Sequence, residues 1–327
     1  LTANATLEDV RAAAVTLSGK IAETWVNILL VRERLDVAWR QLETNEHILK
    51  LLRFRFVNSL ATALDVLQQE ETVAGSQAVL PGLKARERAL LNELAVLMGR
   101  MPGQVAVETR TLPAVPAVPD TGLPADLLAA RPDVRAAGLR LQASDWSVAA
   151  ARADRLPALR LTARGEFFAE QVPNLFDNWL ANLAGSVTGP IFDAGRREAE
   201  VERTRAVVRE RLAAYEAVVA RAIQEVQDAL ATGYFQGLEV QALDRQLAAA
   251  RKSNRQASFR YQNGLIEYNV VLTELLNVQR LEQSVVQARA DLLLERIRLG
   301  RALGGAWTLE LDEPGPEAPS TQRSIHG

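Results

Sequence analysis

The sequence predicts a mainly α-helical protein built from two copies of a long antiparallel helical hairpin, with one β-hairpin in the second copy. Three observations support this fold class: an internal repeat, long stretches of helical periodicity, and a single pair of strand-like runs. Hydrophobic residues make up 48% of the 327 residues and aromatic residues only 5%. Few rings and many alanines suit long helices packed side by side better than a thick globular core.

The internal repeat is the strongest of these signals. The segment Phe54–Leu60 (FRFVNSL) returns 205 residues later as Phe259–Leu265 (FRYQNGL). The same offset aligns residues 42–99 with residues 247–304 without a gap. Solenoid repeats have periods of about 20 to 50 residues, so this is a different kind of repeat. One large supersecondary unit has been duplicated, which predicts pseudo-symmetry about an axis.

Helical periodicity predicts two helices in the first copy, at about residues 6–56 and 62–98. Thr6 is the expected N-cap of the first helix. Pro81 is expected to kink the second helix, and Gly99 to end it.

The segment between the copies changes character. Residues 104–124 contain four prolines and predict an extended connector. A helix at 125–155, a very long helix at 196–262 and a returning helix that ends near Leu303 are expected in the second copy. The long helix would span about 100 Å at 1.5 Å per residue. The predicted division is a first repeat at 1–103, the connector at 104–124, a second repeat at 125–307 and a disordered tail at 308–327.

Residues 158–168 and 179–191 alternate between apolar and polar side chains, which predicts a β-hairpin. Each run has the length that a tilted strand needs to cross a membrane. Periodicity alone fits a membrane barrel and a half-buried soluble sheet equally well. A lone two-stranded hairpin is marginally stable, and closure into a barrel by oligomerisation would satisfy its edges. In the barrel interpretation the lipid-facing residues are Leu159, Leu161, Phe167, Trp179, Leu183 and Val187.

Composition argues against several function classes. The chain has no cysteine, which excludes disulfides, thiolate metal sites and a cysteine nucleophile. Its net charge of -2 gives no electrostatic case for nucleic acid. The sequence has no unbroken run of 18 apolar residues, so it does not predict a helix that spans a membrane. His47 and His326 are far apart, and no phosphate loop, metal-ligand pair or nucleophile elbow is present. We therefore expect no enzymatic activity, no metal and no cofactor.

Four motifs then identify a family. Residues 127–135 (LLAARPDVR), 189–196 (GPIFDAGR), 260–264 (RYQNG) and 301–307 (RALGGAW) resemble the signatures of bacterial outer-membrane efflux proteins, the TolC, OprM and NodT-like family. The motifs cover the second repeat nearly end to end, and the first repeat only in its later part. The resemblance implies a homotrimer that forms one conduit, with a β-barrel in the outer membrane and an α-barrel in the periplasm. The inter-repeat connector would belong to an equatorial region around the helices.

The function that this resemblance implies is a passive exit duct of a tripartite efflux system in the bacterial outer membrane. Its expected partners are identical chains, a periplasmic adaptor, an inner-membrane transporter of RND type, and outer-membrane lipid, but no nucleic acid. The alternative is a soluble coiled-coil scaffold with a packed β-hairpin, because any antiparallel coiled coil would show similar apolar stripes.

One departure from the family pattern concerns the first copy. By the repeat offset, Leu1 corresponds to Ala206, which lies beyond the strands of the second copy. We expect the sequence to be a fragment whose first β-hairpin lies upstream. If the sequence were a whole protein, the barrel prediction would fail.

The resemblance places a periplasmic gate at Asp65, Tyr261, Glu267, Asn269 and Thr273. Thr273 stands where the family has an aspartate that lines the pore, and Asn269 stands where the family has a bulky apolar residue. A polar lock in this chain must therefore use Asp65, Glu267 or neutral hydrogen bonds.

The resemblance also places adaptor contacts at the tips of the two helical hairpins. The tip residues are Asn58, Ser59, Leu60, Asn263, Gly264 and Leu265. Ordinary turn chemistry is the alternative explanation, because glycine permits a tight turn and asparagine tolerates left-handed backbone geometry.

Overall fold

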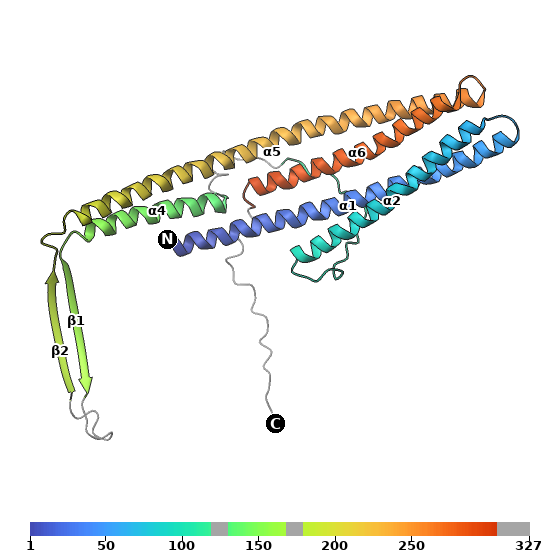
Figure 1. Ribbon diagram of the computed structural model, residues 1–327. Helices are drawn as coiled ribbons and strands as arrows, with labels where there is room; N and C mark the ends of the chain where they lie inside the picture. Colours follow the sequence, from blue (N-terminus) through green and yellow to red (C-terminus); the bar gives the residue numbers. More distant parts are fainter. Residues whose placement is uncertain (119–129, 168–178, 306–327) are drawn as a thin grey trace, which may run out of the picture. The chain divides into compact units, whose positions relative to one another are not determined.

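A computed structural model describes residues 1–118, 130–167 and 179–305, and 76% of these described residues are helical. Its helices are α1 (Thr2–Val57), α2 (Ala63–Leu97), α4 (Pro132–Ala153), α5 (Arg196–Gln262) and α6 (Tyr268–Ala302), and its strands are β1 (Ala158–Phe167) and β2 (Trp179–Thr188). A tight turn joins α1 to the antiparallel α2, and a second turn joins α5 to α6 in the same way (Figure 1). The two predicted helical hairpins and the β-hairpin are therefore confirmed. The predicted tail, residues 119–124 of the predicted connector and residues 125–129 of the helix predicted at 125–155 lie outside the described residues.

The helix ends differ from prediction in two places. α1 begins at Thr2, so the predicted N-cap at Thr6 is wrong: the Thr6 hydroxyl donates to the Thr2 carbonyl oxygen at 3.1 Å, as hydroxyls do inside helices. Pro132 is the first residue of α4 instead of lying inside it. Proline favours that first position because the first helical N–H has no partner inside the helix. Pro81 lies within α2 and does not end it, so the kink there stays a prediction.

α1 also qualifies the expectation that no helix spans a membrane. By length and composition alone, part of α1 is apolar enough to do so, although no unbroken apolar run marks it. Core helices pass the same test, and 44% of the apolar window is buried within the chain itself. Its buried residues pack against α2 and α6, which accounts for the apolar composition.

The helices pack as two compact units that do not coincide with the sequence repeats. One unit combines Leu1–Val10 with Pro132–Arg221, and the other combines Arg11–Arg131 with Ala222–Gly327. In the first unit, Arg135 of α4 pairs with Glu8 near the start of α1 at 2.7 Å, and Arg155, two residues after α4, pairs with Glu198 near the start of α5 at 2.8 Å.

The packing of the second unit repeats along the chain. Leu42, Val73 and Leu80 lie in the apolar cluster between α1 and α2. The residues 205 positions later, Leu247, Val278 and Val285, lie in the cluster between α5 and α6. The duplicated sequence is thus also a duplicated core.

A third cluster joins the two helical hairpins. Val26 and Leu30 on α1 pack with Ala290 and Leu293 on α6. Leu30 is 6% exposed and Ala290 is fully buried. α1 and α6 therefore form the internal junction between the repeats.

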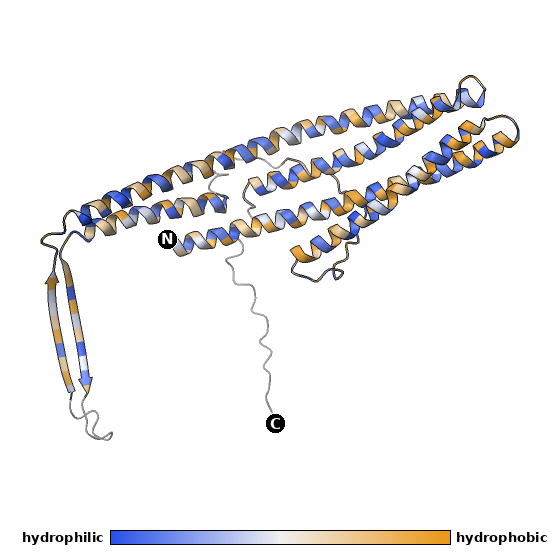
Figure 2. Ribbon diagram, viewed as in Figure 1, coloured by the Kyte–Doolittle hydropathy of each residue, from blue (hydrophilic) through white to orange (hydrophobic). Residues whose placement is uncertain are grey.

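β1 and β2 pair antiparallel, with Ala158 opposite Thr188 at one end and Phe167 opposite Trp179 at the other. The six residues predicted to face lipid lie on one face of the hairpin, because this register places Leu159 opposite Val187 and Ala163 opposite Leu183. Figure 2 shows the resulting alternation of apolar and polar residues along both strands. All six are between 54% and 79% exposed.

A proline stands just beyond each strand at the base of this hairpin. Pro157 precedes Ala158, and Pro190 follows Thr188 after one glycine. That glycine, Gly189, lies against the Pro157 ring, where an added Cβ would approach within 3.1 Å. Proline has no N–H to donate, so the ladder of hydrogen bonds cannot extend through either position.

Candidate functional site: the tips of the helical hairpins

The tip between α1 and α2 is a Schellman motif. The Leu60 N–H donates to the Arg55 carbonyl oxygen at 2.8 Å, and the Ser59 N–H donates to the Phe56 carbonyl oxygen at 2.9 Å. Ser59 has a φ of 60°, the left-handed conformation that this motif requires. The Asn58 side chain donates to the Phe54 carbonyl oxygen at 2.7 Å and satisfies one more carbonyl at the helix end.

The tip between α5 and α6 has the same geometry. Leu265 and Gly264 donate their N–H groups to the carbonyl oxygens of Arg260 and Tyr261, both at 3.0 Å, and Gly264 has a φ of 70°. The Asn263 side chain donates to the Phe259 carbonyl oxygen at 2.7 Å, as its counterpart does in the first tip. The six predicted tip residues therefore form two equivalent turns, and adaptor contact at these turns remains a proposal.

Asp65 holds the first turn of α2. Its carboxylate accepts from the Thr62 N–H at 2.9 Å, and the Thr62 hydroxyl accepts from the Asp65 N–H at 3.2 Å. This reciprocal pair is a capping box. The structure thus gives Asp65 a local role that the predicted gate did not anticipate.

The remaining predicted gate residues of α6 are exposed. Glu267 is the N-cap residue of α6, without a side-chain hydrogen bond to the helix. Thr273 donates its hydroxyl to the Asn269 carbonyl oxygen at 2.8 Å, one turn earlier in the same helix. The structure does not bring these three residues into the cluster around Tyr261.

That cluster joins the two tips. The Arg55 guanidinium carbon lies 4.9 Å from the centre of the Tyr261 ring, a cation–π contact. The Tyr261 and Tyr268 rings have centroids 5.6 Å apart. Burial raises the pKa of the Tyr261 hydroxyl; the nearby Arg55 charge opposes this shift and the Asp65 carboxylate adds to it. Asp65 and Tyr261 are the two predicted gate residues that the structure brings together.

A chain of buried hydrogen bonds continues from Tyr268 across the junction between the repeats. The Tyr268 hydroxyl donates to the Gln69 side-chain oxygen at 2.5 Å, and the Gln69 amide donates to the Asn45 carbonyl oxygen at 2.8 Å. The Asn45 side chain accepts from the Gln279 amide at 2.9 Å and donates to the Ser76 hydroxyl at 2.8 Å. We call these five residues the polar ladder; they join α1, α2 and α6.

The polar ladder is neutral and deeply buried. Asn45 and Gln69 are fully buried and Tyr268 is 3% exposed. Burial is the largest cause that raises the pKa of the Tyr268 hydroxyl, so the hydroxyl keeps its proton and remains a donor. Buried polar groups are costly when unpaired, so the ladder favours one axial position of α6 against α1.

Sequence reasoning missed the polar ladder, although one signal was present. Asn45 lies three residues after Leu42 and four before Leu49, on the apolar stripe of α1. A polar residue in that position is buried, and it requires a partner on a neighbouring helix.

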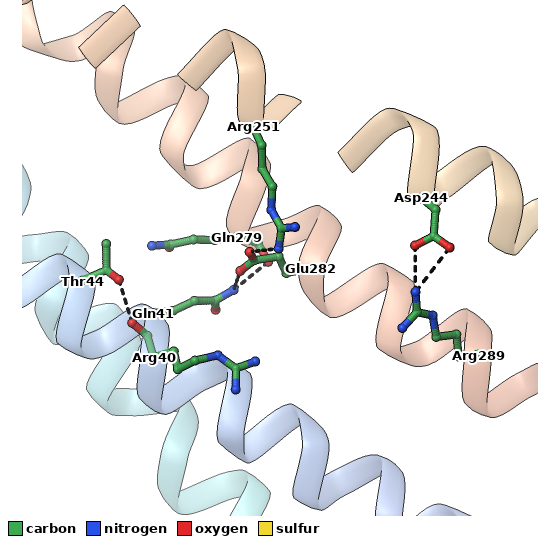
Figure 3. Close-up of polar contacts among 8 residues, drawn as sticks. All are labelled: Arg40, Gln41, Thr44, Asp244, Arg251, Gln279, Glu282 and Arg289. Carbon is green, nitrogen blue, oxygen red and sulfur yellow. Dashed lines mark hydrogen bonds and ion pairs between the residues drawn. The ribbon is translucent and has the colours of Figure 1, made fainter. Parts of the chain in front are cut away.

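Charged contacts extend the junction away from the tips. Figure 3 shows Gln41 of α1 and Arg251 of α5 converging on the Glu282 carboxylate of α6, at 3.2 Å and 2.7 Å. Farther along, Arg289 of α6 donates to Asp244 of α5 at 3.0 Å. Among the described residues no group of three histidine or acidic side chains could hold a metal ion. These contacts position α1, α5 and α6 against one another.

Comparison with known proteins identifies the same architecture. The family described as outer membrane efflux protein matches residues 123–305, more than half of the chain. The pyoverdine export outer membrane protein OpmQ of Pseudomonas aeruginosa is 32% identical over 302 residues, which are 90% of this chain and 62% of the relative. The toluene efflux pump outer membrane protein TtgF of Pseudomonas putida is 30% identical over 93% of this chain and 64% of the relative.

A solved structure, that of the outer-membrane channel OprN, superposes with a TM-score of 0.85. It is 27% identical, and the match covers 94% of this chain and 70% of that chain. The chain thus spans less than two thirds of OpmQ and of TtgF. On the family match, and on the fold that it shares with OprN, the chain belongs to the outer membrane efflux protein family.

Proposed function

We propose that this chain is part of a subunit of an outer-membrane exit channel, through which an efflux pump passes its substrate out of the cell. The observation that carries the proposal is the combination of two equivalent helical hairpins with a β-hairpin whose apolar face is exposed over ten-residue strands. The apolar face suits lipid, and the helices suit the wall of a periplasmic conduit.

Assembly of identical chains is the second part of the proposal. A two-stranded sheet leaves two edges unpaired, and membranes tolerate strands only in closed barrels. We propose that a homotrimer closes the barrel, together with strands from the part of the relatives' length that this chain does not span. The subunit would be a passive duct without catalysis, located in the outer membrane with a periplasmic extension.

The partners follow from the same assignment. OpmQ is named for pyoverdine export and TtgF for toluene efflux, and both are outer membrane proteins of export systems. We propose that this chain receives its substrate from an inner-membrane transporter of RND type through a periplasmic adaptor. The turns at Asn58–Leu60 and Asn263–Leu265 are the proposed adaptor contacts, since they are the exposed ends of both hairpins.

The test uses the complete protein, purified from membranes in detergent. We expect a trimer by mass and single-channel conductance in planar bilayers. A monodisperse monomer that needs no detergent would instead identify a soluble coiled-coil scaffold and overturn the channel proposal.

The tip cluster offers a sharper test of gating. The double variant Asp65→Ala/Tyr261→Phe is expected to raise the conductance of the closed channel, because it removes a carboxylate and a hydroxyl at the tips, where Arg55 lies over the Tyr261 ring. Asp65 also caps α2, so Thr62→Ala is the matched control that breaks the cap and keeps the charge. Equal conductance in the double variant and the wild type would show that the two residues have no role in gating and serve only the local structure of the tips.

A further inference from the structure

We propose that Arg160 makes the duct favour anions at the point where the helices meet the barrel, so that substrates with carboxylate, sulfate or phosphate groups pass this point more readily than cations. The inference rests on the proposed function, in which identical copies enclose a channel, and it names the charge of the substrates that the channel prefers. It is argued from the charges on one face of the β-hairpin and from the ion pairs at the base of the hairpin.

The polar face of the hairpin is the face opposite the residues proposed to contact lipid. The strand register places Arg160 opposite Ser186 and Arg164 opposite Asn182, so these four side chains lie on one face. In a membrane barrel, the face that points away from lipid lines the interior. In the proposed barrel both arginines therefore line the channel.

The two arginines differ in how their charge is balanced. Arg164 forms an ion pair with Glu166, two residues along the same face of β1. Glu166 is the single acidic residue in the two described strands. Arg160 is exposed, and it has no ion-pair partner in the part of the chain that the structure describes. The polar face therefore carries one net positive charge, located at Arg160.

Arg160 is the third residue of β1 and lies at the base of the hairpin, where the strands adjoin the end of α4 and the start of α5 (Figure 1). A cavity of about 780 Å³ lies at this base, and its lining includes Arg160, Thr188, Asp154 and Arg196. The charges of Asp154 and Arg196 are opposite and cancel. The positive charge of Arg160 therefore remains when the base is included.

The other acidic side chains near the base are already engaged. Three carboxylates each pair with an arginine other than Arg160: Asp193 with Arg197, Glu198 with Arg155, and Glu200 with Arg203. The hydrogen bond from Arg203 is the largest cause that lowers the pKa of the Glu200 carboxyl, so this carboxylate stays ionised and paired. These three carboxylates do not neutralise Arg160.

An assembly of identical chains would turn this single charge into a ring. A guanidinium keeps its positive charge throughout the physiological pH range. In a closed symmetric oligomer the same residue recurs at the same height in every copy. Rings of arginine or lysine favour anions in pores, whereas acidic rings favour cations. At low salt, a unit charge about 10 Å from an ion in water changes the local concentration of that ion about twofold.

The reversal potential of the complete protein in planar bilayers, measured in a gradient of potassium chloride, tests this inference. The wild type is compared with Arg160→Gln, which keeps a polar side chain and removes the charge. We expect the chloride-to-potassium permeability ratio at low salt to fall about twofold or more in the variant. Because salt screens the ring, the difference should disappear near about 1 M salt, where the Debye length is about 3 Å.

Two further variants separate charge from structure. Arg160→Lys keeps the positive charge and is expected to keep the wild-type permeability ratio. Arg164→Gln/Glu166→Gln removes two paired charges from the same face without changing its net charge, and it is also expected to keep that ratio. An unchanged ratio in Arg160→Gln would overturn the role of Arg160. An equal fall in Arg160→Lys, or a difference that persists at high salt, would overturn it too, because both indicate altered pore structure.

Failure of the proposed function gives a different result. Wild-type protein that forms no channel in the bilayer would overturn the duct itself. Channels whose permeability ratio does not depend on Arg160 would leave the duct in place and reject only its preference for anions.

Discussion

Ser59 and Gly264 occupy the same left-handed position in the two tips, yet only one of them is glycine. The left-handed region costs an ordinary residue about 1 to 2 kcal/mol, and glycine avoids that cost. We expect Gly264→Ala to lower the free energy of unfolding by roughly 1 kcal/mol, whereas Ser59→Gly leaves it unchanged or raises it slightly. Denaturant unfolding of the two variants checks this, and losses of equal size would contradict the equivalence of the tips.

Two tyrosines, the buried Tyr268 and the half-buried Tyr261, predict how stability depends on pH. A free tyrosine has a pKa of about 10, and burial raises the pKa of both Tyr261 and Tyr268. The folded chain then holds protons that the unfolded chain releases, so the stabilisation is complete below about pH 10 and is lost as pH rises through the folded pKa values.

Unfolding midpoints measured on the alkaline side would show this decline. We expect Tyr268→Phe to make it shallower, and Tyr234→Phe, at an exposed position, to leave it as in the wild type. A decline that Tyr268→Phe leaves unchanged would show that other groups cause it.

Residue-level roles were only partly predictable from the sequence. Asparagine and glycine favour turns, so the positions of Asn58 and Gly264 in turns were predictable from their residue types, and the structure places them there. Asp65 was assigned to a gate by resemblance. Its capping role depends on Thr62 three residues earlier, and this spacing in the sequence already predicts a capping box. Tyr268 was missed because its partners Gln69 and Asn45 come from other helices.

At the scale of elements, the polar ladder joins the two helical hairpins, and single substitutions can test its contribution to stability. Gln69→Leu would leave the Tyr268 hydroxyl buried without an acceptor and would remove the hydrogen bond that joins α2 to the Asn45 carbonyl. We expect it to cost about 1 to 3 kcal/mol of stability, as unpaired buried groups do. Gln77→Leu, at an exposed position on the same helix, is the control and should change stability by less than about 0.5 kcal/mol.

A double-mutant cycle separates the ladder from general packing. Adding Tyr268→Phe to Gln69→Leu removes the unpaired hydroxyl, so the double variant should lose less stability than the sum of the single variants, by about 1 kcal/mol. Strict additivity of the two losses would show that the hydrogen bond between these side chains contributes little.

The helices themselves were the most predictable elements. α5 begins at Arg196 and ends at Gln262, as its periodicity and flanking glycines predict. The start of α4 was harder to predict. The sequence favours helix ahead of Pro132 as well, and only the proline marks the first turn. The repeat predicted the equivalence of the helical hairpins, but not which helices would meet at the junction between them.

At the scale of the whole molecule, the two faces of the β-hairpin should respond oppositely to charge. Leu183 lies near the middle of β2 on the apolar face, and Ala184 is its neighbour on the other face. We expect Leu183→Arg to destabilise the membrane-inserted protein by about 2 to 4 kcal/mol and Ala184→Arg to be tolerated. The fraction folded into lipid vesicles across a denaturant series measures both. Equal losses would indicate a sheet packed on protein instead of lipid.

The prolines that flank the strands have a consequence for the membrane itself. Pro157 and Pro190 both lie at the base of the hairpin, so the pairing of β1 with β2 cannot extend past Ala158 and Thr188 toward the helices. Ten residues span about 34 Å along the strand, and a tilt of about 45° reduces this to roughly 24 Å across the membrane. The prolines therefore fix where the sheet ends beside the helices, and lipids with shorter or longer chains would have to adapt to that boundary.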